Sequence, residues 1–146
     1  EAPIDVSDVD DLSELESLDG IICGIPTWNT GADEERSGTA WDSILEDIGE
    51  LSLSGKKVAI FGLGDSSTYT ENYCDAMEEL HSYFIKAGAE MVGYVDKSSY
   101  TFDESKSVIG ESFCGLPLDE DSESDLTDSR LETWASQLKG EIPSLA

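Results

Sequence analysis

Two short stretches contain the residue types best suited to binding a flat ring. Residues 26–31 read PTWNTG, and residues 62–73 read GLGDSSTYTENY. Each stretch sets one aromatic side chain, Trp28 or Tyr69, among turn formers and small residues whose backbone amides a ligand can approach closely. Two such aromatics on neighbouring loops can enclose a planar ring, and each stacking contact contributes about 1 kcal/mol beyond simple burial. Free amides around the ring can then bind the edge of a heterocycle.

Either aromatic taken alone has a simpler explanation. Trp28 or Tyr69 could plug the end of a sheet as an ordinary part of the core, and for a single residue we favour that explanation. For two aromatics on adjacent loops we favour the ring site, because one ligand then accounts for both residues.

No other motif indicates catalysis. The GLGD sequence at residues 62–65 lacks the full G-x-G-x-x-G, and G-x-x-x-x-G-K-[ST] does not occur in the chain. The only histidine, His81, falls in a predicted helix without triad partners, so we expect a surface or partly packed side chain. The acidic run LDEDSESD at residues 118–125 lacks the EF-hand spacing and glycine, which favours a solvated loop over a cation site. The chain is therefore predicted not to be an enzyme and to hold no metal.

Alternating strand and helix patterns predict the elements that position the two loops. Three apolar runs rich in β-branched residues, at 21–25, 58–61 and 91–95, are typical of strands buried on both faces, as in a parallel sheet. Apolar stripes at helical spacing lie between and after them. These stripes are Trp41, Ile44, Leu45 and Ile48; Tyr73, Met77, Leu80 and Phe84; and Leu131, Trp134, Ala135 and Leu138.

The ends of the last helix and the segment before it can also be predicted. Thr127 is a suitable N-cap, and Lys139 followed by Gly140 is a suitable stop. Between residues 95 and 127 only SFCGLPLD, residues 112–119, resembles a strand, and Pro117 within it favours an edge position.

The fold predicted from this alternation is a doubly wound α/β sheet with a parallel strand arrangement and helices on both faces. Ligands of such sheets bind outside the carboxyl ends of the strands, near the point where strand order reverses. The stretches 26–31 and 62–73 follow the first two strong strands, so we expect both loops to open on one edge.

The charge of the chain restricts its partners. The sequence has 33 Asp and Glu against 8 Lys and Arg, which gives a formal net charge of -25. Such a field repels nucleic acid and anionic membrane surfaces, and it attracts proteins with basic patches at a salt-dependent rate. The alternative is that the acidity only keeps the protein soluble.

Length and cysteine content narrow the class further. The 146 residues match one domain, 1–146, with enough apolar content for a core. Cys23, Cys74 and Cys114 are odd in number and widely spaced, so neither a disulfide framework nor a thiolate metal site is expected, which favours a reducing compartment. The longest apolar run is far too short to span a membrane, and the acidic N-terminus is unlike a signal or transit peptide. We expect a soluble chain without membrane insertion, already processed if it is targeted.

The sequence resembles the long-chain flavodoxins of cyanobacteria and algae over nearly its whole length. PTWNTG is similar to their loop beneath one flavin face, and GLGDSSTYTENYCDA to the loop that carries the other face. Residues 103–142 resemble the inserted segment, the split last strand and the final helix of the long-chain group. The resemblance implies a flavodoxin-like three-layer α/β/α sandwich with the flavin mononucleotide (FMN) at the point where strand order reverses.

The resemblance further implies a low-potential one-electron carrier that uses FMN. Trp28 and Tyr69 would stack on the two ring faces, and the Asn29–Thr30 peptide would adjust to the protonation of flavin N5. An anionic reduced flavin between apolar rings in a negative field is disfavoured, which lowers its potential. The implied FMN-binding residues are Thr27, Trp28, Asn29, Thr30, Gly31, Leu63, Gly64, Asp65, Tyr69 and Asn72. The implied partners are photosystem I and ferredoxin-NADP reductase, in a chloroplast stroma or a cyanobacterial cytoplasm.

One departure from the family pattern concerns the start of the chain. EAPIDVSDV, at residues 1–9, matches the second strand of flavodoxins, so their first strand, phosphate loop and first helix have no counterpart in this sequence. The resemblance then implies an unpaired apolar edge on the strand at 21–25 and no amides for the FMN phosphate. Three explanations are open at this point: the sequence omits an N-terminal part, another chain supplies that part, or the protein is a cofactor-free docking or structural subunit derived from a flavodoxin.

Overall fold

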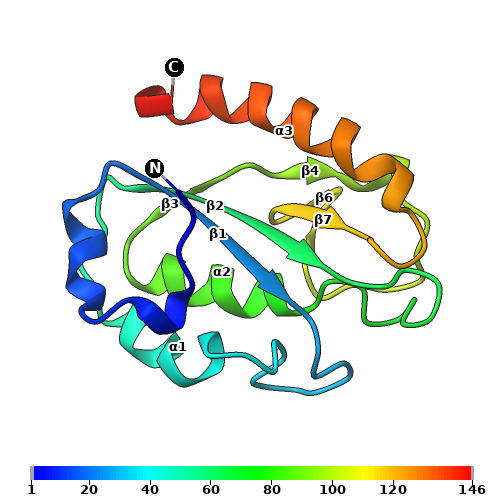
Figure 1. Cartoon of the computed structure of the whole chain (residues 1–146), viewed down its shortest axis with the longest axis horizontal. Coiled ribbons are helices and arrows are strands. Elements are labelled where there is room, and N and C mark those ends of the chain that lie inside the picture. Colours follow the sequence, from blue (N-terminus) through cyan, green and yellow to red (C-terminus); the bar gives the residue numbers. More distant parts are fainter. Residues whose placement is uncertain (1, 146) are drawn as a thin grey trace.

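A parallel four-stranded sheet forms the centre of the computed structural model, which describes residues 2–145 (Figure 1). Strand β2 (Lys57–Leu63) lies in the middle and pairs along its whole length with β1 (Gly20–Pro26). The opposite side of β2 pairs with β3 (Glu90–Val92) at its start and with β7 (Leu116–Leu118) at its end. All three pairings are parallel. The prediction of parallel strands is therefore confirmed at 21–25 and 58–61, and at 91–92 within the predicted segment 91–95.

Helices cover both faces of this sheet. In Figure 1, α1 (Trp41–Gly49) and α2 (Ala76–Lys86) lie on one side of the strands, and α3 (Thr127–Glu141) lies on the other. The predicted three-layer α/β/α sandwich is thus confirmed. Short 3-10 helices occupy the connections: η1 (Val6–Asp8), η2 (Leu12–Ser17), η3 (Lys97–Ser99), η4 (Ser124–Leu126) and η5 (Pro143–Leu145).

The alternation of side chains along β2 explains the two cores. Val58 and Ile60 belong to the larger cluster with residues of α1 and α2, whereas Ala59 belongs to the smaller cluster with residues of α3. Successive side chains of a strand point to opposite faces, so a strand that is apolar at every position needs a helix layer on both sides. The continuous apolar run at residues 58–61 therefore predicts the layering as well as the strand.

The last strand of the sheet is split by a small second sheet. After β3 the chain turns at Gly93, whose φ is 79°, so the predicted strand at 91–95 ends early. The antiparallel strands β4 (Val95–Asp96), β5 (Val108–Ile109) and β6 (Ser112–Phe113) follow, and the chain then returns as β7. The strand-like piece at 112–119 thus divides between two sheets. The edge position that Pro117 predicts is confirmed, since β7 pairs only with β2 among the strands of residues 2–145.

The N-terminal segment does not form the strand that its resemblance implies. Asp5 and Asp11 instead accept hydrogen bonds from the amides of Ser7 and Ser13, which bends the chain into η1 and η2. Glu1 lies outside the described residues. Within residues 2–145 no strand pairs with the outer edge of β1, and the Ile22 side chain on β1 is 46% exposed.

Two predicted helix signals in α3 are wrong. Thr127 is the first residue of the helix rather than its cap, and its buried hydroxyl has no hydrogen-bond partner in the described part of the chain. Gly140 lies inside the helix, which ends one residue later and is followed by Pro143. No helix of the described residues is both long enough and apolar enough to cross a bilayer.

Replacing Gly115 should show how closely β7 approaches β2. A Cβ at this position would lie 2.2 Å from the backbone oxygen of Ile60, so Gly115→Ala should lower the free energy of unfolding by about 1 to 3 kcal/mol. Gly140→Ala is the control, because its Cβ meets nothing within 4 Å and the substitution should stabilise the helix by about 0.5 to 1 kcal/mol. Urea unfolding measures both, and equal midpoints for Gly115→Ala and the wild type would contradict the packing.

Candidate functional site

The two predicted loops begin side by side. In the parallel register of β1 and β2, Pro26 is opposite Leu63, and the amide of Thr27 donates to the Leu63 carbonyl at 3.2 Å. The arrows of both strands point to the same edge in Figure 1. The expectation that both loops open on one edge of the sheet is therefore confirmed.

Backbone hydrogen bonds shape the first loop into a narrow hairpin. The amides of Trp28 and Asn29 donate to the carbonyls of Ser37 and Arg36, each at 3.1 Å. At the tip, the amide of Ala32 donates to the Asn29 carbonyl at 3.2 Å. Gly31 has a φ of 84°, the left-handed conformation that the third position of a type II turn requires. PTWNTG thus encodes a strand end followed by a tight turn.

The two aromatic side chains are exposed, so neither plugs the end of the sheet. Trp28 is 75% exposed and Tyr69 is 49% exposed. The aromatic cluster of the core consists of other residues, of which Phe102 is only partly buried: Tyr73, Tyr100, Phe102 and Phe113. Explaining Trp28 and Tyr69 as core residues is therefore wrong. Two large apolar surfaces on adjacent loops at the carboxyl edge are typical of a binding site that is completed by its ligand.

The other residues predicted on the first loop divide between structural and exposed roles. Thr27 is buried, and its hydroxyl oxygen accepts a hydrogen bond from the amide of Ala76 at the start of α2. The Thr30 hydroxyl donates to the Thr27 carbonyl at 3.1 Å. Asn29 and Gly31 are exposed. The loop therefore has a fixed base and an accessible tip.

Asp65 organises the second loop. Its carboxylate accepts hydrogen bonds from the amides of Thr68 and Ser67 and from the Ser122 hydroxyl. These bonds, that of the Thr68 amide foremost, hold the pKa of Asp65 below its usual range. The amide of Tyr69 donates to the Asp65 carbonyl at 3.0 Å, so the turn that presents Tyr69 starts at this residue.

The remaining residues predicted on the second loop lie around this turn. Leu63 is partly exposed at the end of β2, and Asn72 is half-buried with its amide donating to the Tyr69 carbonyl at 3.0 Å. Gly64 is half-buried, and a Cβ there would lie 2.9 Å from both the backbone nitrogen and the Sγ of Cys74. Only glycine fits at position 64 in this packing.

Sequence reasoning missed the residue that anchors the second loop. Asp119 belongs to the acidic run that was expected to be solvated, but it is fully buried. Its Oδ2 accepts from the amide of Ser66 at 2.9 Å and the hydroxyl of Ser66 at 2.6 Å, and its Oδ1 accepts from the amides of Asp121 and Ser122 at 3.0 and 2.8 Å. The available signal was its place directly after a buried strand at the ligand-binding edge.

Burial of the three cysteines and of His81 shifts the pKa of each in the direction that favours its neutral form. Burial raises the pKa of Cys23 and of Cys114 to about 12 and also raises the pKa of Cys74, so all three free thiols are protonated at neutral pH. His81 was expected to be at the surface or partly packed, but it is buried and hydrogen-bonds the Tyr94 hydroxyl. Burial also lowers the pKa of His81.

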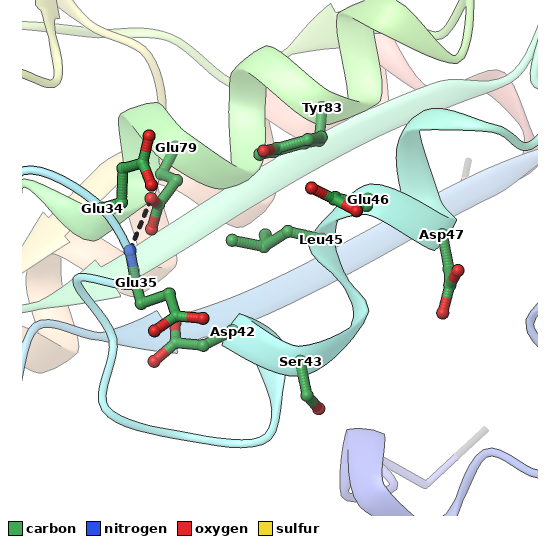
Figure 2. Close-up of a pocket in the computed structure, with 9 residues that line it drawn as sticks. All are labelled: Glu34, Glu35, Asp42, Ser43, Leu45, Glu46, Asp47, Glu79 and Tyr83. Carbon is green, nitrogen blue, oxygen red and sulfur yellow. Dashed lines mark hydrogen bonds between the residues drawn. The ribbon is translucent and has the colours of Figure 1, made fainter.

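Two cavities flank the loops. One, of about 320 Å³, lies between the first loop, α1 and α2, and Figure 2 shows the six carboxylate side chains that line it: Glu34, Glu35, Asp42, Glu46, Asp47 and Glu79. The other, of about 410 Å³, lies beside the second loop and is lined largely by hydroxyl groups and Phe102. No group of three or more histidine, cysteine or carboxylate side chains in residues 2–145 could hold a metal ion.

The fold is that of a doubly wound α/β protein, and the two exposed aromatic side chains at the carboxyl edge of its sheet form a candidate site. The chain belongs to the flavodoxin family: the family profile described as Flavodoxin matches residues 2–134.

Similar proteins have the same family name. A flavodoxin of Synechococcus elongatus is 42% identical over 144 residues, which cover 97% of this chain and 82% of the relative. A Synechocystis flavodoxin is 41% identical over 136 residues, covering 93% of this chain and 76% of that protein. A solved structure of Fusobacterium nucleatum flavodoxin bound to FMN superimposes with a TM-score of 0.81 at 29% identity and covers 88% of this chain and 75% of its own.

Asp119→Asn should loosen the loop that presents Tyr69. An asparagine has one acceptor oxygen, so its amide group would face N–H donors that the carboxylate now satisfies, and the free energy of unfolding should fall by about 2 kcal/mol. Glu120→Gln changes the same charge on the exposed neighbour and should have little effect. Urea unfolding and amide exchange at Ser66 measure the difference. Equal exchange rates at Ser66 in the two variants would show that Asp119 does not anchor the loop.

Proposed function

We propose that this chain is a low-potential one-electron carrier that binds FMN between Trp28 and Tyr69, and that it is not an enzyme. The observation that carries this proposal is the pair of exposed aromatic side chains on adjacent loops of a flavodoxin-family chain. Fusobacterium nucleatum flavodoxin bound to FMN has the same fold. Neither this neighbour nor the family match supports the alternative of a cofactor-free docking or structural subunit.

The residues of the two loops fit a flat, polar-edged ring. Trp28 and Tyr69 offer apolar faces, and glycine and turn positions beside them leave backbone groups accessible at the ring edge. We assign the ring edge and the ribityl chain to five residues, largely through their backbone groups: Thr27, Leu63, Gly64, Asp65 and Asn72. We place the peptide between Asn29 and Thr30, with Gly31 after it in the turn, beside flavin N5.

The chain acts on the cofactor through packing and charge. When bound, FMN supplies the one-electron redox chemistry, and the protein tunes it. Trp28 and Tyr69 exclude water from the ring faces, and the net charge of -25 makes added negative charge at the site less favourable. Both effects lower the reduction potential.

The partners of a flavodoxin are other redox proteins, and we propose basic ones for this chain. Photosystem I and ferredoxin-NADP reductase are our specific candidates, with the chloroplast stroma or the cyanobacterial cytoplasm as the location. Cyanobacterial flavodoxins among the similar proteins support this choice. The acidic cavity beside the Trp28 loop places negative charge next to one of the two loops that we propose bind the flavin, where it can attract a basic partner. We also propose that residues 1–146 fold as one domain, because the two core clusters share β2.

Trp28→Ala should weaken flavin binding by at least about tenfold, since it removes one stacking face together with its buried area. Titration of the wild type and the variant with both FMN and riboflavin, followed by flavin fluorescence, tests this effect. Riboflavin has the same ring as FMN but lacks the phosphate, so the loss of a ring contact should weaken the binding of both ligands by a similar factor. Ile109→Ala, another partly exposed apolar residue on β5, is the control. Absence of binding of either flavin to the wild type would overturn the proposed function.

Electron transfer to a basic redox partner should slow steeply with added salt. Raising the ionic strength from about 0.01 M to 0.15 M shortens the Debye length from about 30 Å to about 8 Å, which screens the long-range attraction of the acidic surface. Second-order rate constants measured across this range provide the test. A flat profile would remove the acidic surface from the docking mechanism and would indicate an apolar contact.

A further inference from the structure

We propose that Glu79 of α2 is a positioning residue that holds the Trp28 loop in the shape that binds the ring. The inference rests on the proposed function for its effect on flavin, whereas the hold on the loop is a property of the chain itself. Glu79 is far from Trp28 in sequence and belongs to a helix that the proposed site does not include. Its side chain is turned toward the loop backbone in Figure 2.

Both carboxylate oxygens of Glu79 are engaged by the loop. Oε2 accepts from the amide of Glu35 at 2.8 Å, and Oε1 accepts from the amide of Arg36 at 3.0 Å. Glu79 is only 8% exposed, so these bonds form in a largely water-excluded place where a charged acceptor is strong. Within residues 2–145, no other carboxylate that lines this cavity accepts a hydrogen bond from these two amides.

Glu35 and Arg36, whose amides bind Glu79, also bind the tip of the loop through their carbonyl groups. The carbonyl of Arg36 accepts from the amide of Asn29 at 3.1 Å, and the carbonyl of Glu35 accepts from Asn29 Nδ2 at 3.0 Å. One residue further along, the carbonyl of Ser37 accepts from the amide of Trp28. The same two peptide segments thus bind Glu79 through their N–H groups and the tip through their carbonyls. We call residues 35–37 the arm of the loop. A shift of this arm would move Trp28 and Asn29, because both are hydrogen-bonded to it.

The arm needs an external hold because its conformation is unfavourable by itself. Glu35 has a φ of 56°, in the left-handed region that residues other than glycine, asparagine and aspartate rarely adopt. Arg36 adds a second attachment: its Nη1 lies 2.6 Å from Glu78 Oε2 and donates to the Asp75 carbonyl at 3.2 Å. Without Glu79, the backbone amides at 35 and 36 would lose their acceptors while the strained conformation remained.

The decisive variant is Glu79→Gln, because a glutamine of nearly the same size has one acceptor oxygen and would turn N–H donors toward one of the two amides. Amide exchange at Asn29, Glu35 and Arg36 should quicken roughly tenfold, and the dissociation constants for riboflavin and FMN should rise by a similar factor. Glu46→Gln is the matched control, since it removes the same charge from the same cavity at an exposed position. It should leave exchange and both dissociation constants unchanged.

A second variant separates reach from charge. Glu79→Asp keeps the carboxylate but is one methylene shorter, so it should also quicken exchange at Asn29 if the hold depends on position. If exchange at Asn29 is as slow in Glu79→Asp as in the wild type but faster in Glu79→Gln, the charge in the cavity, and not the position of the carboxylate, is responsible for the slow exchange. Exchange at amides of α3, together with cooperative unfolding, verifies that both variants remain folded.

The outcomes distinguish this inference from the proposed function. Unchanged exchange at Asn29 in Glu79→Gln overturns the hold on the loop, and faster exchange with wild-type flavin affinity shows that Glu79 is structural only. If the wild type binds neither FMN nor riboflavin, the proposed function fails, and exchange at Asn29 alone decides whether Glu79 holds the loop.

Discussion

The pairing of β1 with β2 over seven residue pairs is the constraint on which the rest of the structure depends. Because the two strands run parallel and in full register, they end together, and the loops that follow start within hydrogen-bond distance of each other. The apolar side chains of β2 point to both faces of the sheet, and they pack against α1 and α2 on one face and against α3 on the other. A shift of one register position would turn the side chains of β1 to the wrong face and would separate the two aromatic loops.

Buried carboxylates outside the two loops determine the shape of both. Asp119, after β7, accepts the donors of Ser66 in the second loop, and Glu79, in α2, accepts the amides at 35 and 36 in the first. Asp119 directly follows β7 and Glu79 lies in α2, so the positions of the two loops are set by the sheet and by this helix. An acidic chain is suited to this arrangement, since a carboxylate accepts hydrogen bonds from several backbone amides and offers no donor of its own.

The sequence predicted the elements well and their fine structure less well, for physical reasons that particular residues illustrate. The apolar runs at 21–25 and 58–61 need burial on both faces, so they indicate the parallel sheet without further information. The third strand ends before Gly93, which packs against Trp134 and Leu138 of a helix about forty residues away, a contact that the local sequence does not show. The resemblance of residues 1–9 to the second strand of flavodoxins could not indicate a strand by itself, because a strand forms only against a partner.

The candidate site shows the same division between local and distant information. Trp28 and Tyr69 could be recognised from the sequence because large aromatic residues are unusual among the glycines and turn formers of a solvent-exposed loop. Glu79 and Asp119 were not, because each is one carboxylate among 33 acidic residues and only the folded chain shows which of them are buried. Because Glu79 and Asp119 hold the backbone of the two loops, the aromatic rings of Trp28 and Tyr69 are not needed to stabilise these loops. Their exposure therefore does not weaken the fold, and changes at the distant carboxylates can alter the site without touching its surface.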